Sequence, residues 1–137
     1  MERQKKVIDA SICVKLFADE ENSDKAFKLI ERYNNEEIVL IAPSLIFLET
    51  LNALKYKKFD KYALEKSNRD MFDFQFEIID VDKDILEISI RLSNQHNLSI
   101  YDSFYAAISE KYNAELVTAD DKLSKIPNAK LLSSLQI

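Results

Sequence analysis

The sequence contains no glycine, and this absence excludes several kinds of ligand site. Its 137 residues include none, whereas average usage of about 7% would give roughly ten. A phosphate-binding P-loop, a dinucleotide-binding G-x-G-x-x-G turn and a G-x-S-x-G nucleophile elbow need backbone at positive φ or close to a ligand, which glycine provides. None of these sites is expected here.

Cysteine and histidine are each present only once, as Cys13 and His96. One cysteine cannot form an internal disulfide or a thiolate zinc cage, and one histidine cannot supply the two imidazoles of an H-E-x-x-H motif. If the protein carries out chemistry, carboxylates are expected to supply the reactive side chains.

The chain also lacks an excess of positive charge and a long apolar run. With 24 acidic and 19 basic residues its formal net charge is -5, so a polyanionic partner would need local positive charge. The longest apolar stretch, residues 38–48, is shorter than the roughly 20 residues of a membrane span. Asp9 and Lys15 interrupt the region where a signal peptide would be apolar. We expect a cytoplasmic protein with no membrane contact.

Apolar runs alternate with helical patterns along the whole chain, and neither a linker nor a repeat interrupts them. The 47% hydrophobic content suits a single domain over residues 1–137. Ser23 and Asp82 are expected to cap helices, and Pro43 to lie in the first turn of one. The alternation, without hairpin signals, predicts an α/β fold with a parallel sheet covered on both faces. Strands are predicted at 6–9, 38–42, 76–81, 115–118 and 130–132, and helices at 11–17, 23–33, 43–56, about 61–72, 83–94 and 99–112.

Four acids fall near the predicted carboxyl ends of strands, where such sheets bind ligands. Asp9 ends the first strand, Asp120 follows the strand 115–118, and Asp102 opens a helix. Glu49 lies two turns into the helix after the second strand, and Asn52, three residues later, shares its face.

Converging carboxylates repel one another, which raises their pKa values unless a divalent cation neutralises them. Because the available donors are oxygens, Mg²⁺ or Mn²⁺ fits best. Such an ion activates water and stabilises charge on a phosphoryl oxygen. It would also provide the local positive charge that this acidic protein otherwise lacks.

Four segments resemble the signature segments of the PIN domain, in the order and at the spacing of that family. They are VIDAS (7–11), APSLIFLETLNAL (42–54), LSIYDSFYAAISEKY (98–112) and ELVTADDKL (115–123). The likeness is closest to the small VapC-type toxins of prokaryotic toxin-antitoxin pairs. It implies a three-layer α/β/α fold with a central parallel sheet of four to five strands. It further implies a Mg²⁺- or Mn²⁺-dependent endoribonuclease with RNA as substrate, a cognate antitoxin and a homodimer.

The resemblance also assigns roles to individual residues. Ser11 and Thr118 correspond to small polar residues that support the metal ligands, and Asn52 to an asparagine often seen three residues after the second acid. Ser109 departs from the family pattern, which usually has alanine there, and Asp121 is as readily explained by helix capping. The four acids of the family, as both catalytic and metal-binding residues, correspond to Asp9, Glu49, Asp102 and Asp120.

Three other interpretations remain open at this point. The fold could serve as a non-catalytic interaction module, or as a PIN nuclease of another RNA-processing pathway. A receiver-like phosphoacceptor would also use an acidic pocket, but it requires paired acids after the first strand, where Asp9 stands alone. Candidate interfaces for the antitoxin and the homodimer are the helix 45–56 and the segment after it. The apolar residues of this helix cover more than one core-facing stripe.

Overall fold

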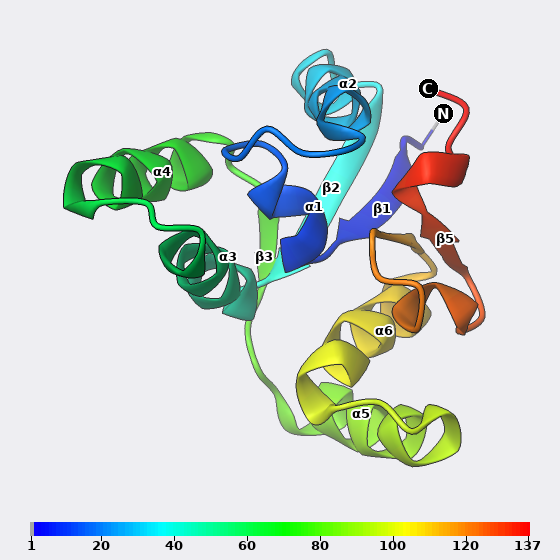
Figure 1. Cartoon of the computed structure of the whole chain (residues 1–137). Helices are drawn as coiled ribbons and strands as arrows, with labels where there is room; N and C mark the ends of the chain where they lie inside the picture. Colours follow the sequence, from blue (N-terminus) through cyan, green and yellow to red (C-terminus); the bar gives the residue numbers. More distant parts are fainter. Residues whose placement is uncertain (1) are drawn as a thin grey trace.

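A parallel five-stranded sheet forms the centre of the protein (Figure 1). The structure, a computed structural model, describes residues 2–137. The strand order is β3-β2-β1-β4-β5, and every neighbouring pair is parallel. With helices on both faces, this is the predicted three-layer α/β/α architecture, which is therefore confirmed. The strands are β1 (Gln4–Ile8), β2 (Ile38–Pro43), β3 (Glu77–Ile79), β4 (Glu115–Thr118) and β5 (Ala129–Leu131).

Two groups of helices cover the two faces of the sheet. Because parallel crossovers are right-handed, the connections from β1 to β3 place α1 to α4 on one face. The connection from β3 to β4 runs in the opposite direction and places α5 and α6 on the other face (Figure 1). No helix within residues 2–137 is long and apolar enough to cross a membrane. The helices are α1 (Ala10–Val14), α2 (Ser23–Asn34), α3 (Leu45–Tyr56), α4 (Lys61–Asp73), α5 (Lys83–His96) and α6 (Ile100–Tyr112).

Side-chain caps fix where several helices begin. The Asp82 carboxylate accepts the Ile85 N–H at 2.8 Å, as predicted, and so starts α5. Ser99 accepts the Asp102 N–H at 3.0 Å and starts α6. These caps satisfy backbone donors that have no partner inside the helix. They also fix the register of α6, and therefore the place of Asp102.

The structure corrects two local predictions. Pro43 is the last residue of β2 rather than part of a helix, and it pairs with Ile79 of β3. The pairing of β2 with β1 ends at Ile41, so the missing proline N–H is not required on that side. Asn22, in a left-handed conformation, is the N-cap of α2 in place of Ser23, whose hydroxyl bonds to the preceding loop instead.

Each of the five long helices is followed within two residues by a residue with positive φ, although the chain has no glycine. At the end of α3, the Phe59 N–H donates to the Leu54 carbonyl at 3.2 Å and the Lys58 N–H to that of Lys55 at 3.0 Å. This Schellman pattern places Lys58 at φ 73°, a position that usually holds glycine. A residue with a Cβ atom is strained there by about 1–2 kcal/mol. The five residues are Glu36, Lys58, Gln75, Asn97 and Asn113.

We predict that Lys58→Gly raises the free energy of unfolding by about 1 kcal/mol, because it removes most of the left-handed strain. Urea denaturation of the two proteins measures the difference. Lys58→Ala is the matched control, since it removes the same charge but keeps the Cβ atom. Equal stability of the glycine and alanine variants would contradict the prediction.

Candidate active site

The candidate site lies at the carboxyl edge of the sheet, between β1 and β4. These strands are neighbours, but the chain leaves β1 toward β2 and leaves β4 toward β5, on the opposite side. Such a reversal of direction opens a crevice at the strand ends, and open α/β sheets bind ligands there. Asp9 directly follows β1, and Asp120 comes two residues after the end of β4.

Asp9 is the most constrained of the four predicted acids. Its side chain is only 5% exposed and caps α1, accepting the Ile12 N–H at 3.3 Å. The Ser11 hydroxyl donates to Asp9 Oδ1 at 2.5 Å, and the Thr118 hydroxyl donates to Oδ2. Ser11 also accepts the Ala119 N–H at 2.9 Å. The two hydroxyls therefore connect the Asp9 carboxylate to the ends of both strands.

Burial nevertheless disfavours the charge on Asp9. Loss of solvent raises the pKa of Asp9 to about 6, the hydrogen bonds from Ser11, Thr118 and Ile12 oppose the rise, and the negative charge of Asp102 adds to it. The charged carboxylate is thus held in place, but no cation among residues 2–137 neutralises it.

Asp102 lies in the first turn of α6 and is half-buried. Its pKa is raised above the usual value, first by burial and then by the nearby charge of Asp120, whereas the Ser99 hydroxyl and the Lys122 ammonium oppose the rise. Asp102 is therefore close enough to Asp120 for their charges to repel. Lys122 is a cation beside this site that the sequence motifs did not identify.

Glu49 projects from the second turn of α3 and is also half-buried. The Tyr105 hydroxyl, from α6, donates to Glu49 Oε1 at 2.6 Å. Burial raises the pKa of Glu49, the bond from Tyr105 opposes the rise, and Asp102 adds to it. Burial and Glu49 also raise the pKa of Tyr105, which keeps the hydroxyl protonated as a donor. No local sequence pattern reveals this contact, because Tyr105 and Glu49 are 56 residues apart in the chain.

The remaining predicted residues lie at the exposed rim. Asp120 is exposed, and its Oδ1 accepts the N–H groups of Lys122 at 2.8 Å and Leu123 at 3.3 Å. Asp120, rather than Asp121, therefore caps the turn that follows β4. Asn52 is exposed one turn beyond Glu49.

The four acids form one electrostatic group, but they are not a preformed ion cage. The charge of Asp102 affects Asp9 and Glu49 and is itself affected by Asp120. Among residues 2–137, no three carboxylate, imidazole or thiolate groups lie close enough together to hold a metal ion. The donor set, all oxygen, fits Mg²⁺ or Mn²⁺, and Mg²⁺ commonly keeps several waters between itself and its carboxylates. A site of this kind needs water-mediated contacts or small side-chain movements.

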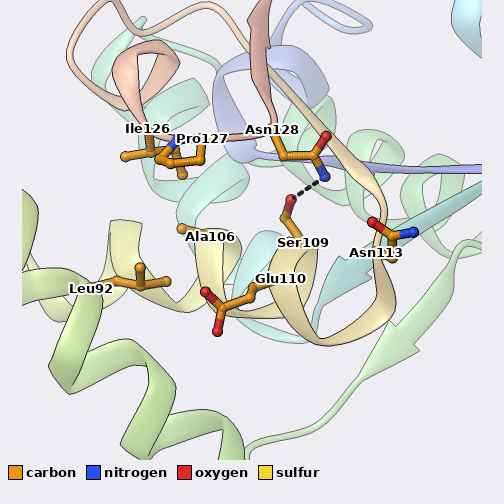
Figure 2. Close-up of a pocket in the computed structure, with 8 residues that line it drawn as sticks. All are labelled: Leu92, Ala106, Ser109, Glu110, Asn113, Ile126, Pro127 and Asn128. Carbon is orange, nitrogen blue, oxygen red and sulfur yellow. Dashed lines mark hydrogen bonds between the residues drawn. The ribbon is translucent and has the colours of Figure 1, made fainter.

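A separate pocket of about 200 Å³ lies near the other end of α6 and contains none of the four acids (Figure 2). The Asn128 amide donates to the Ser109 hydroxyl at 3.4 Å and to the Ala114 carbonyl at 2.9 Å. Ser109 donates to the same carbonyl. The serine that departs from the family pattern therefore has a structural explanation. It satisfies the backbone where α6 leads into β4.

The protein is thus an open parallel α/β sheet with carboxylates at its switch point, the position where sheets of this class bind ligands. Comparison with known proteins identifies the family. The sequence matches the PIN domain family over residues 6–129. Because this match spans most of the chain, the protein belongs to the PIN domain family, as the sequence motifs predicted. No curated protein matches the sequence.

Several solved structures share the fold. A toxin-antitoxin complex from Klebsiella pneumoniae has a TM-score of 0.72 and 22% identity, covering 93% of this chain and 97% of its counterpart. The VapBC2 complex of Rickettsia felis, bound to promoter DNA, has a TM-score of 0.69 and 21% identity, covering 93% and 97%. The sarcin-ricin loop cleaving toxin VapC20 of Mycobacterium tuberculosis has a TM-score of 0.68 and 15% identity, covering 87% and 92%.

We predict that Asp9→Asn stabilises the metal-free protein at neutral pH. Because the native pKa of Asp9 lies at about 6 and the unfolded value at 3.8, the native state binds the proton more tightly. The stability that this group contributes is present below pH 4, declines as the pH rises to about 6, and stays low above it. The loss amounts to about 3 kcal/mol at 1.36 kcal/mol per pKa unit.

Urea denaturation with a chelator at several pH values between 4 and 8 measures this effect. The stability of Asp9→Asn relative to wild type should increase between pH 4 and 6 and then remain constant. A relative stability that does not change with pH would contradict the prediction.

Proposed function

We propose that the protein is a metal-dependent endoribonuclease that hydrolyses RNA phosphodiester bonds, and that it is the toxin of a toxin-antitoxin pair. The observation that carries the proposal is the group of mutually repelling carboxylates at the switch point, with Asp9 buried at its centre. An uncompensated group of this kind destabilises the fold, and a divalent cation would relieve the repulsion. Mg²⁺ or Mn²⁺ would be the cofactor.

Each acid has a role in the proposed site. Asp9 and Asp102 would bind the ion, and Glu49 and Asp120 would contact it directly or through water. When bound, the ion polarises a phosphoryl oxygen and increases the acidity of water. One carboxylate of the group would orient or deprotonate the attacking water.

Ser11 and Thr118 would act through Asp9 rather than on the substrate. Both hydroxyls donate to the Asp9 carboxylate, one to each oxygen. They therefore restrict its rotation while leaving lone pairs on each oxygen for an ion. Asn52 lies exposed near Glu49 and would contact RNA or water at the rim.

The structural neighbours support the toxin assignment. One is named a sarcin-ricin loop cleaving toxin, and another a toxin-antitoxin complex. An interaction module without catalysis would not need a buried carboxylate with a raised pKa such as Asp9. The receiver-like alternative conflicts with the strand order, because receiver proteins have the order 2-1-3-4-5.

Two apolar surfaces on α3 support a homodimer and an antitoxin partner. The first is a groove of about 360 Å³ between α3, α5 and α6, in which Leu48 is 71%, Tyr101 62% and Val81 60% exposed. Tyr101 therefore belongs to this surface and not to the core. The second surface joins α3 to α4, where Phe47 and Phe72 stack with ring centroids 4.1 Å apart. Exposed apolar patches of this kind mark interfaces, and we assign the groove to the homodimer and the stacked pair to the antitoxin.

Cleavage of a panel of structured and unstructured RNAs with Mn²⁺ or Mg²⁺ tests the nuclease. We expect cleavage that a chelator abolishes and that Asp9→Asn reduces about a thousandfold or more, because metal activation supplies several kcal/mol at the transition state. Asp73→Asn, which removes an exposed carboxylate at the end of α4, is the control and should cleave as wild type. A folded protein that binds no Mn²⁺ would overturn the proposal.

From these two assignments we predict that a lysine in the groove disrupts the homodimer, and that a lysine at the stacked pair disrupts antitoxin binding. Leu48→Lys should convert a dimer into a monomer of 15.9 kDa, because an unpaired charge in the groove weakens association at least about a hundredfold. Phe72→Lys should leave the dimer intact and abolish co-purification with the product of the neighbouring gene. Light scattering after size-exclusion chromatography measures the mass. A wild-type monomer would refute the dimer assignment.

A further inference from the structure

Tyr105 differs from the other tyrosines in its burial. Of six tyrosines in the sequence it is the one that is fully buried, with 1% of its surface exposed. It lies one turn after Asp102 on α6, so that both side chains leave the same helix close to the site. A buried phenol hydroxyl normally requires a hydrogen-bond partner. Here the partner is a carboxylate on another helix, Glu49 Oε1, at 2.6 Å.

The bond joins two helices that, apart from β2, pack against different elements. Helix α3 packs against α1, α4 and β2, whereas α6 packs against α5 and the strands β1, β2 and β4. Among residues 2–137, the bond from Tyr105 to Glu49 is the only side-chain hydrogen bond between α3 and α6. Helix α3 carries Glu49 and helix α6 carries Asp102, both of them predicted site acids. The bond therefore fixes where Glu49 lies relative to Asp102.

Only one oxygen of Glu49 is used in this contact. The Tyr105 hydroxyl bonds to Oε1, and no hydrogen bond among residues 2–137 reaches Oε2. Glutamate has three side-chain torsions, and ordering such a flexible side chain costs conformational entropy on ligand binding. A bond made before the ligand arrives removes part of that cost and leaves Oε2 available.

We propose that Tyr105 is a positioning residue, whose hydroxyl holds Glu49 so that Oε2 is presented to the divalent cation or to a water bound to it. The inference rests on the metal site of the proposed function. It assigns to Tyr105 a role toward Glu49 and not toward the substrate.

Calorimetric titration of Mn²⁺ into metal-free protein, without RNA, tests this role. Tyr105→Phe keeps the buried ring and removes only the hydroxyl. Because loss of a group that orients a metal ligand typically weakens metal binding 10–100-fold, we expect a weakening of about that size. Tyr112→Phe, a half-buried tyrosine on the same helix, is the control and should bind Mn²⁺ as wild type.

A double-mutant cycle separates positioning from a merely structural contribution. In a Glu49→Ala background no carboxylate remains to be positioned, so adding Tyr105→Phe should not weaken Mn²⁺ binding further. A structural effect of the hydroxyl would weaken binding by the same factor in both backgrounds. Should Tyr105→Phe fail to fold, Glu49→Asp gives a second route. It keeps the charge but is one methylene too short for the bond, and it should lose Mn²⁺ affinity to a similar extent.

The outcomes distinguish this inference from the function on which it rests. Wild-type binding with unchanged affinity in Tyr105→Phe, or equal losses in both backgrounds, would overturn the positioning role and leave the metal site intact. Failure of the folded wild type to bind Mn²⁺ would overturn the metal site and the inference together.

Discussion

The buried carboxylate of Asp9 is the constraint on which the rest of the site depends. It lies where β1 and β4 are neighbours and where the chain leaves them in opposite directions. Its hydrogen-bond partners therefore come from both strand ends. A charge in that position requires donors on each oxygen. The sequence provides them two residues after Asp9, at Ser11, and at the end of β4, at Thr118. The orientation of the Asp9 carboxylate thus depends both on the pairing of β1 with β4 and on the start of α1, which Asp9 caps.

The remaining acids extend this arrangement outward in order of decreasing burial. Asp102 and Glu49 are half-buried and Asp120 is exposed, so the negative region reaches from the interior to solvent. An ion entering from solvent would meet increasing negative charge and decreasing hydration toward Asp9. Both effects strengthen electrostatic attraction. The same arrangement lowers the stability of the empty protein, because burial and mutual repulsion raise the pKa values of three of the acids. The protein is thus less stable at the site where we propose that an ion binds.

Sequence patterns predicted the layers of the fold and the neighbourhood of the acids, because both follow from local runs and from strand direction. The limits of β4 were predicted as observed, and Asp82 caps its helix as expected. Helical periodicity could not place Tyr101, since spacing of three and four residues does not distinguish a core face from the exposed groove in which Tyr101 lies. It also could not pair Tyr105 with Glu49. That contact depends on how α3 and α6 approach each other, which no local pattern encodes.

The glycine-free backbone has a consequence for the unfolded chain and for motion in the folded one. Glycine has more backbone freedom than any other residue, so a chain without it has fewer unfolded conformations to lose. The smaller loss of conformational entropy on folding favours the native state, and it offsets part of the strain of the left-handed residues at the helix ends. The connections around the sheet likewise contain no glycine, the residue with the widest range of backbone conformations. Adjustment to a ligand is therefore expected to depend more on side-chain rotation than on movement of the loops.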